Sequence, residues 1–156
     1  MATDHRTIEI TAVSWDDPAA VRLRAAQRTE LDARYGTDDH EPGALPTAET
    51  VAVFLVARDG SGTAVGCGGL RPLGPGSGEI KRMYVEPAAR GTGVAAALLR
   101  ALEEHARGLG VTRLLLETGA GQPDAIRFYQ REGYEPTEAY GPYVGEPVSR
   151  CFARDL

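Results

Sequence analysis

The chain has 156 residues, of which 42% are hydrophobic and 25% are charged, and its formal net charge is −5 at pH 7. This size and composition predict one globular domain, residues 1–156, with enough buried apolar surface to fold alone. The acidic balance argues against nucleic acid as the main partner, because a surface that binds phosphates is normally basic. We find no apolar run long enough for a membrane span and no secretory signal, so we expect a cytoplasmic protein.

The two cysteines, Cys67 and Cys151, have no second Cys or His at the spacing of metal ligands. They predict neither a zinc site nor a disulfide framework, and buried free thiols are the simpler interpretation. We therefore expect no metal. Lys81 is the only lysine among the 17 basic residues, a bias that is typical of GC-rich genomes and suggests a bacterial source.

The first fifty residues predict a strand, a helix and a loop. Residues 7–13 form the strand, and the Asp-Asp-Pro sequence of residues 16–18 supplies the acidic cap and first-turn proline of a helix that runs to about Tyr35. Residues 36–48 are rich in Gly and Pro and predict a loop that could hold one short helical turn. Three acidic side chains in this loop could attract a cationic amine, or could simply be solvated; they are Asp38, Asp39 and Glu41.

The middle of the chain predicts a hairpin, a third strand and the strongest helix. Residues 50–57 and 63–70 are rich in Val, Phe and Leu, and the Asp-Gly-Ser-Gly sequence between them is typical of an antiparallel hairpin. A strand over residues 79–85 follows a flexible, glycine-rich turn. Apolar residues then repeat at helical spacing from Thr92 to about Arg107, where glycines end the pattern.

The last third of the chain predicts three more strands and one helix. The leucines of residues 114–116 are too few for a helix and fit a buried strand. A helix over residues 123–131 is stopped by Gly133, Tyr134 opens another strand, and residues 149–154 alternate as a closing strand. This order predicts an α/β domain with a mixed sheet that helices cover.

The join between the third strand and the strongest helix is predicted to bind an anion. Gly91 and Gly93 let successive N–H groups converge on one point, and the first helical turn adds unpaired donors and a positive dipole end. Arg90 supplies a fixed positive charge beside them. A turn that merely needs glycine is the alternative. A Walker loop and a dinucleotide-binding fingerprint are excluded, because their Gly-Lys-Ser/Thr and third glycine are missing.

At this join the sequence resembles the GNAT superfamily of N-acetyltransferases. Residues 90–95, Arg-Gly-Thr-Gly-Val-Ala, match the family signature of Arg or Gln, two residues, Gly, one residue, then Gly or Ala. Residues 125–134 are similar to the second motif, a helix that carries a tyrosine and ends in Gly and an aromatic residue. The resemblance covers roughly residues 50–156. It implies a mixed, mostly antiparallel sheet of six to seven strands, with a central splayed parallel pair and about four flanking helices.

The resemblance also implies acetyl-CoA as the cosubstrate. Its pantetheine arm would pair with the backbone of residues 83–85, and its pyrophosphate would rest on the amides of residues 91–96. A backbone N–H near Met83 could polarise the thioester carbonyl. Gln122 stands where many members have an asparagine that bonds the arm. The residues implied to hold the cofactor are Met83, Tyr84, Val85, Arg90, Gly91, Thr92, Gly93, Val94, Ala95, Ala96 and Gln122.

Glu79 is a candidate general base. A free alkylamine is mostly protonated at neutral pH, so a group that accepts its proton would help the attack. Histone acetyltransferases of the superfamily that use a glutamate base carry it at the position of Glu79. On a strand of period two, Glu79 would share one face with Lys81, Met83 and Val85. The alternative is a strand-end carboxylate that pairs with Lys81 or Arg82.

Tyr129 is a candidate general acid, because it matches the family's tyrosine that protonates the departing thiolate. The alternative is a tyrosine that only packs beside Phe128. Gln27 and Glu30 lie on or near the inward stripe of the first helix, where the family's acceptor pocket often forms.

Three functions remain open. Residues 79–85, 116–119 and 141–147 look like those of a bacterial subgroup associated with small, amino-acid-like amines, which favours transfer of an acetyl group to the primary amine of a small molecule. A protein or peptide N-acetyltransferase would need an open groove. A non-catalytic sensor would keep the acyl-CoA site and lose turnover. The habit of the superfamily suggests a homodimer.

Overall fold

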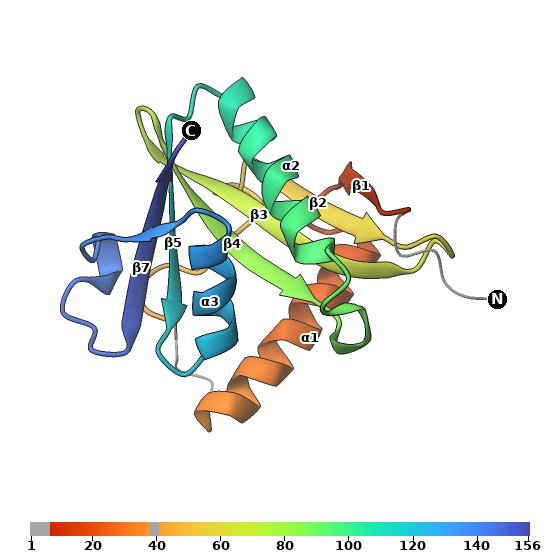
Figure 1. The fold of residues 1–156 in the computed structure, drawn as a ribbon, viewed down its shortest axis with the longest axis horizontal. Coiled ribbons are helices and arrows are strands. Elements are labelled where there is room, and N and C mark those ends of the chain that lie inside the picture. Colours follow the sequence, from red (N-terminus) through yellow and green to blue (C-terminus); the bar gives the residue numbers. More distant parts are fainter. Residues whose placement is uncertain (1–6, 38–40) are drawn as a thin grey trace.

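In the computed structural model, which describes residues 7–37 and 41–156, seven strands form one sheet and three α-helices cover it (Figure 1). The strands are β1 (Glu9–Ala12), β2 (Val53–Arg58), β3 (Ala64–Gly74), β4 (Ser77–Val85), β5 (Arg113–Gly119), β6 (Glu135–Pro136) and β7 (Ser149–Asp155). The helices are α1 (Pro18–Tyr35), α2 (Val94–Gly108) and α3 (Pro123–Arg131), with 3-10 turns η1 (Pro87–Ala89) and η2 (Gly141–Tyr143). The predicted fold class is confirmed.

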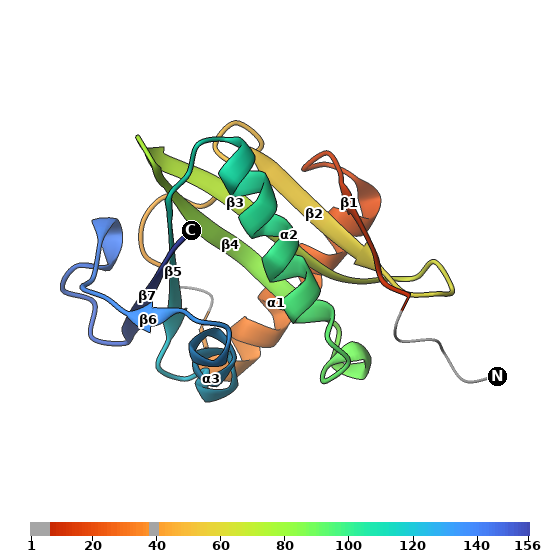
Figure 2. The same cartoon turned by 45° about the horizontal axis from the view of Figure 1, so that its top comes forward.

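The sheet has the order β1-β2-β3-β4-β5-β7-β6. The β4–β5 pair is parallel, and the other neighbours in the described sheet are antiparallel. Figure 2 shows the short β6 beside β7 at one edge. The parallel pair therefore lies near the middle of the sheet, where helices cover both faces.

The helix ends follow the predicted signals. The Asp17 carboxylate accepts hydrogen bonds from the N–H groups of Ala19 and Ala20, at 3.0 and 3.3 Å, and caps α1. Gly36 ends this helix with φ +71°, a conformation that glycine adopts without strain. Gly93, with φ +91°, precedes the first residue of α2.

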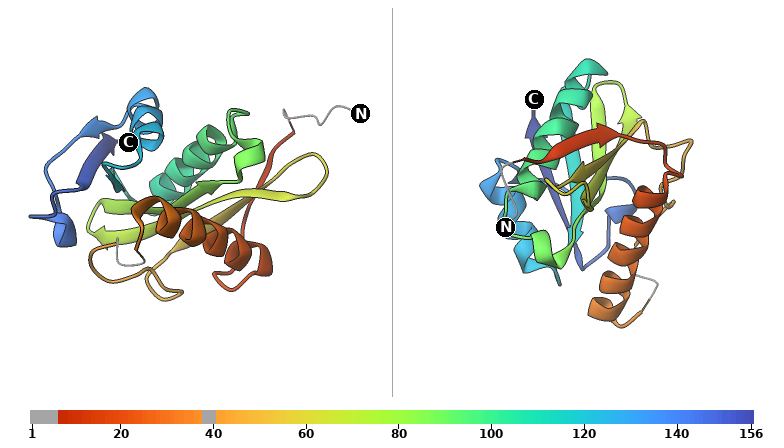
Figure 3. Two further views of the ribbon diagram at one scale, coloured as in Figure 1. Left: turned by 90° about the horizontal axis from the view of Figure 1, so that it is seen from below. Right: turned by 90° about the vertical axis from the view of Figure 1, so that its right-hand side faces the viewer.

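Two apolar clusters cover opposite faces of the sheet. Helix α1 lies on one face and helices α2 and α3 on the other (Figure 3). Successive side chains of β2 point to opposite faces and so enter different clusters. Leu55 packs in the cluster under α2, and Phe54 packs in the cluster under α1. Because both faces are buried, β2 is a nearly continuous apolar run.

The β3–β4 hairpin is longer than predicted. β3 runs to Gly74 and β4 begins at Ser77, so the expected flexible turn is a tight connection through residues 75 and 76. In the loop predicted over residues 36–48, described residues 41–46 form no helical turn, but a hydrogen-bonded turn begins at its end, where the N–H groups of Thr50 and Val51 donate to the Thr47 carbonyl at 3.1 Å. Asp38 and Asp39 lie outside the described residues.

Both cysteines are buried free thiols, as predicted. Burial raises the pKa of the Cys67 thiol to about 12, which keeps it protonated and unreactive at neutral pH. None of the helices in the described ranges is long and apolar enough to cross a membrane.

A buried carboxylate, Glu103 of α2, ties three parts of the fold together. Its side chain accepts hydrogen bonds from Tyr134 Oη at 2.7 Å, from Arg154 of β7 at 3.0 Å and from Arg100 at 2.5 Å. Only 1% of Glu103 is exposed. Arg100 also contacts Glu132 after α3, so this network fixes α3 relative to α2 and β7.

We predict that Glu103→Gln lowers the free energy of unfolding by about 3 kcal/mol, because it leaves two arginines without their buried partner. Both arginines are partly exposed, which keeps the loss near the lower end of the range for broken buried pairs. Urea denaturation measures it. Glu104→Gln, one residue along the helix in an exposed pair with Arg107, is the control and should cost less than about 0.5 kcal/mol. A similar small loss for Glu103→Gln would contradict the role of the network.

Candidate active site

The two central parallel strands separate after a short shared stretch. β4 and β5 pair at three positions, Ser77 to Glu79 against Arg113 to Leu115, and no register partner follows although both strands continue. Figure 1 shows them diverging. A diverging pair leaves backbone N–H and C=O groups along one edge of β4 that a ligand could pair with.

β4 contains a β-bulge at this separation. In the pairing of β3 with β4, Cys67 lies opposite Tyr84, and Gly69 lies opposite Lys81. The step between these two pairs is two residues on β3 but three on β4, so β4 has one extra residue here. Arg82, within this stretch, has φ +60°, in the left-handed region that side chains rarely adopt. The extra residue redirects the side chains that follow it.

The bulge overturns the prediction that Glu79, Lys81, Met83 and Val85 share one face of β4. Glu79 and Lys81 both contact the hydroxyl of Tyr143, whereas Met83 and Val85 pack against the core under α2. One inserted residue shifts a period-two alternation to the opposite face. Glu79 therefore does not point in the same direction as the side chains of residues 83 and 85.

Two connected hollows lie where the strands separate. The first, of about 300 Å³, which we call the splay cavity, lies between β4, β5 and α1, and Lys81, Tyr35 and Glu117 are part of its lining. The second, of about 400 Å³, which we call the loop groove, follows the end of β4, the start of α2 and the face of α3. The residues that line both are Gln27, Leu31, Met83, Gln122, Ala125 and Tyr129.

Nearly all of the predicted cofactor residues line the loop groove. They are Met83, Tyr84, Val85, Arg90, Gly91, Gly93, Val94, Ala95, Ala96 and Gln122. Thr92 is the exception, because its hydroxyl donates to the Ala89 carbonyl at 2.5 Å and it lines a different hollow. Ten of the eleven residues predicted to hold the cofactor therefore line the same groove.

The glycines of the motif form an open cradle. Gly91 and Gly93 have φ +78° and +91°, and a side chain added at either would meet no described atom within 4 Å. Their conformation explains why glycine is needed, and the open space above them could admit a phosphate. Arg90 donates to the Val85 carbonyl at 2.9 Å and to Glu30 of α1 at 2.7 Å. The residues present therefore fit a pyrophosphate.

Tyr129 lies at the junction of the splay cavity and the loop groove. It is 8% exposed, and its ring packs edge-on against Phe128 and Tyr134. Its hydroxyl has no hydrogen bond among the residues that the structure describes. Burial raises the pKa of Tyr129 well above its usual value, so the phenol is a neutral donor at physiological pH.

Gln122 is held by the first helix. Its Nε2 donates to Tyr35 Oη at 3.2 Å. Tyr35 lies directly over two glycines at the end of β5: a Cβ at Gly119 would stand 1.8 Å from Tyr35 Oη, and one at Gly121 would stand 3.1 Å from its ring. These glycines make room for an aromatic wall of the splay cavity.

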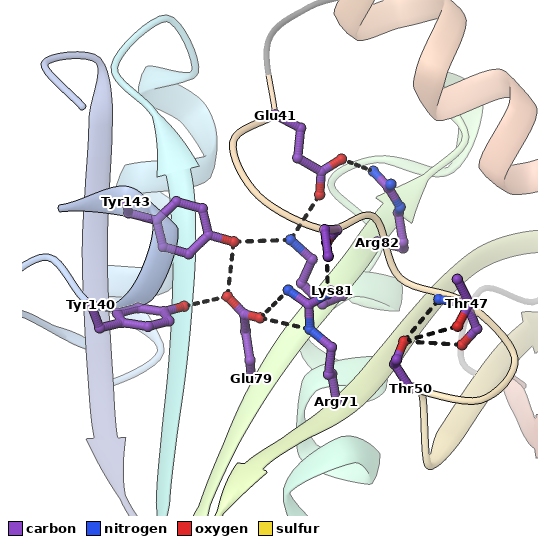
Figure 4. A network of polar contacts seen from close by, with 10 residues as sticks. Glu41, Thr47, Thr50, Arg71, Glu79, Lys81, Arg82, Tyr140 and Tyr143 are labelled. Atoms are coloured by element: carbon purple, nitrogen blue, oxygen red, sulfur yellow. Dashed lines mark hydrogen bonds and ion pairs between the residues drawn. The ribbon is translucent and has the colours of Figure 1, made fainter. Parts of the chain in front are cut away.

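Glu79 is sealed inside a polar network rather than lining a hollow (Figure 4). It is 1% exposed, and its oxygens accept from Arg71 at 2.7 Å, from Tyr140 at 2.6 Å and from Tyr143 at 3.0 Å. Its ionic partner is Arg71, the residue opposite it on β3, so the alternative pairing with Lys81 or Arg82 is wrong.

Glu117 is a carboxylate in the site that sequence reasoning missed. It lines the splay cavity on β5 and accepts a hydrogen bond from Ser149 Oγ at 2.7 Å. Burial raises the pKa of Glu117, and the Ser149 hydrogen bond lowers it by a smaller amount. Its position directly after the three leucines of residues 114–116, on a strand of the parallel pair, was the available signal.

Lys81, Arg82 and Glu41 also line the splay cavity. Glu41 comes from the loop after α1 and pairs with both cations. From α1, Gln27 Nε2 donates to the Met83 carbonyl at 2.9 Å, and its Oε1 is buried without a hydrogen-bond partner among the described residues. The cavity therefore has a charged end, and an amide acceptor near Met83.

Comparison with known proteins places this site in a family context. The family described as "Acetyltransferase (GNAT) family" matches residues 13–134. An IAA acetyltransferase of Azospirillum brasilense is 45% identical over 104 residues, which cover 66% of this chain and 67% of that protein.

Solved structures agree with this match. A Klebsiella pneumoniae protein described as an acyl-CoA N-acyltransferase is 38% identical, with a TM-score of 0.81 over 96% of this chain and 98% of that one. A GNAT family acetyltransferase from Elizabethkingia anophelis with acetyl-CoA bound is 18% identical, with a TM-score of 0.70 over 96% and 98% of the two chains. The second likeness is one of fold.

We predict that Gly93→Val weakens CoA binding at least about tenfold, because the side chain would enter the space above the cradle and strain the backbone. Isothermal titration calorimetry with CoA measures the change. Gly62→Val is the matched control, since Gly62 also has a positive φ, +84°, and open space around it, but lies outside the loop groove. Equal CoA affinity in the two variants would mean that the pyrophosphate does not lie on this cradle.

Proposed function

Because the chain belongs to the GNAT acetyltransferase family and is an acetyl-CoA-dependent N-acetyltransferase, we propose that it acetylates the primary amine of a small molecule by direct attack. The observation that carries this proposal is the splay cavity, a hollow of about 300 Å³ that meets the loop groove at Tyr129 and Met83. Its size is suited to a small ligand. The name of the relative from Azospirillum also supports a small-molecule acceptor.

Acetyl-CoA, when bound, supplies the acetyl thioester. The amides of residues 91–96 and the charge of Arg90 would hold its pyrophosphate, and the free edge of β4 at residues 83–85 would pair with its pantetheine arm. Arg90 would then exchange its contact with Glu30 for a phosphate. A backbone N–H near Met83, next to the bulge, would donate to the carbonyl oxygen as negative charge develops on it.

The proton of the attacking amine goes to Glu117 in this proposal. Glu117 faces the splay cavity, whereas Glu79 is enclosed by Arg71 and two tyrosine hydroxyls and lines neither hollow. A base must reach the proton that it removes, directly or through one water. We therefore prefer Glu117 to Glu79 as the base, and assign Glu79 a positioning role at the fork of the strands.

The departing sulfur takes its proton from Tyr129. The Tyr129 hydroxyl lies at the junction of the two hollows and is not committed to a described partner. Its raised pKa keeps it protonated until a thiolate forms beside it. The nitrogen–carbon bond forms and the carbon–sulfur bond breaks; Glu117 then releases the amine proton to solvent, and Tyr129 recovers a proton from solvent.

We predict that Tyr129→Phe lowers kcat by about 10- to 1000-fold with little change in CoA affinity. Thiol release from acetyl-CoA at saturating amine, together with calorimetry, measures both quantities. Tyr134→Phe is the control: this buried tyrosine packs against Tyr129 but bonds Glu103, so its loss should reduce stability and spare kcat. Unchanged kcat in Tyr129→Phe would remove the general acid.

We predict that Glu117→Gln lowers kcat/KM about 100-fold and removes the acidic limb of its pH profile. The base works when it is deprotonated, so wild-type activity should fall as the pH drops through the raised pKa of Glu117. Ser149→Ala deletes a hydrogen bond that lowers this pKa, and should move the limb to higher pH. If the acidic limb stays at the same pH in Ser149→Ala and is still present in Glu117→Gln, a group other than Glu117 causes it.

A further inference from the structure

Two neighbouring cations of β4 hold a single carboxylate at the charged end of the splay cavity. Glu41 Oε1 lies 2.8 Å from Lys81 Nζ, and Glu41 Oε2 lies 2.8 Å from an Arg82 nitrogen (Figure 4). The side chains of Lys81, Arg82 and Glu41 are only 8%, 17% and 11% exposed. We call Lys81 and Arg82 the carboxylate clamp.

The clamp stabilises an anion strongly. Burial alone would raise the pKa of Glu41, but the charges of Lys81 and Arg82 and the hydrogen bond from Lys81 outweigh it, and the pKa lies below its usual value. A partly buried oxyanion gains most from such charge-assisted contacts. The clamp is thus built to hold a carboxylate in the wall of a cavity, and this structure fills it with one from the chain itself.

The two cations of the clamp contact one carboxylate between them. Lys81 and Arg82 share the one carboxylate of Glu41, and the other contact of Lys81 is the neutral hydroxyl of Tyr143, at 3.1 Å. The nearby Glu79 is already paired with Arg71.

Two more groups affect the charge at this end of the splay cavity. Arg24 of α1, which stacks on Trp15, adds a positive charge near Arg82 that Asp16 partly offsets, and its buried Nη1 has no hydrogen-bond partner among the described residues. Glu117, whose pKa is raised, would become neutral when it takes the amine proton. Positive charge therefore exceeds negative charge at this end of the cavity during turnover.

We propose that the acceptor is a small amine that also carries an oxyanion, a carboxylate or a phosphonate, and that Lys81 and Arg82 hold this oxyanion in the place of Glu41. The inference rests on the proposed function and names the class of its acceptor. Glu41 is then a tethered competitor, which the acceptor displaces from the clamp.

The position of the clamp sets the size of the acceptor. Lys81 precedes Met83 by two residues of β4, which the bulge at Arg82 brings closer than the roughly 7 Å of an extended strand, and Met83 borders both hollows. An oxyanion on the clamp would leave room for only a few bonds before the amine meets the thioester. Short amino acids and aminoalkylphosphonates have this spacing.

Matched acceptors test the proposal. Ethylamine, β-alanine and 2-aminoethylphosphonate share one aminoethyl group and differ in the oxyanion, and thiol release from acetyl-CoA gives kcat/KM for each. We expect one or both of the anionic amines to exceed ethylamine by about 100-fold, as two charge-assisted contacts allow. The better of the two identifies the oxyanion. Equal values for all three with ready turnover would overturn the clamp while leaving the proposed function intact.

The variant Glu41→Gln tests whether Glu41 competes with the acceptor for the clamp or has only a structural role. It frees the clamp at nearly constant shape, so the affinity of the CoA-loaded protein for propionate or ethylphosphonate, which lack the amine, should rise about tenfold by calorimetry. Glu49→Gln, an exposed glutamate of the same loop, is the control and should change nothing. Unchanged or weaker affinity in Glu41→Gln would overturn the proposal.

A double variant removes the more buried cation of the clamp together with its partner. Lys81→Met in the Glu41→Gln background deletes both charges of the Lys81–Glu41 pair, so Lys81 is not left as an unpaired ion, and Arg82, the more exposed cation, remains. The gain in propionate and ethylphosphonate affinity should disappear, and retention of the gain would overturn the assignment to Lys81. These binding measurements need no turnover: the predicted binding pattern with no thiol release from any amine would sustain the clamp and reject the proposed function.

Discussion

The early end of one strand pairing is the constraint on which the site depends. β4 and β5 share three positions and then separate, although each continues for several residues. Backbone N–H and C=O groups in the middle of a sheet are costly to leave without hydrogen bonds. The point where β4 and β5 separate, which we call the fork, therefore needs side chains that hold the strands in place and a ligand that pairs with the free backbone. Glu79 stands at the last shared position, and Arg71, Tyr140 and Tyr143 bond to it there. This network braces the fork, while the slot beyond it remains available to a ligand.

The bulge at Arg82 determines which side chains of β4 line the cavity beyond the fork. Without an extra residue, the faces of β4 would continue unbroken, and Lys81 would lie on the same side as Met83. With it, Lys81 and Arg82 turn toward Glu41, and Met83 turns toward the core under α2. A single strand thus presents two cations to one hollow and a backbone edge to the other. The positive φ of Arg82 is a strained conformation that this arrangement requires.

Local signals predicted much of this fold and part of the lining of the candidate site. The capped start of α1, the hairpin, the glycine cradle and the position of Tyr129 all follow from short-range patterns that tertiary contacts do not override. The sequence does not reveal the bulge, because the run from Ile80 to Val85 reads as an ordinary strand. This hid the direction of Glu79. Its partner Arg71 could have been found from the hairpin register, whereas Glu41 comes from a loop without any periodicity.

The charges of the splay cavity also bear on how an amine becomes a nucleophile. An ammonium ion that enters beside Lys81 and Arg82 meets two like charges, which lower its pKa and favour the neutral amine. In the proposed mechanism, Glu117 would then remove a proton that is already held more weakly, so a carboxylate could serve as the base although its pKa lies far below that of a free alkylamine. An oxyanion on the same molecule would keep such an acceptor bound despite this repulsion. One pair of cations would thereby both select the acceptor and activate it.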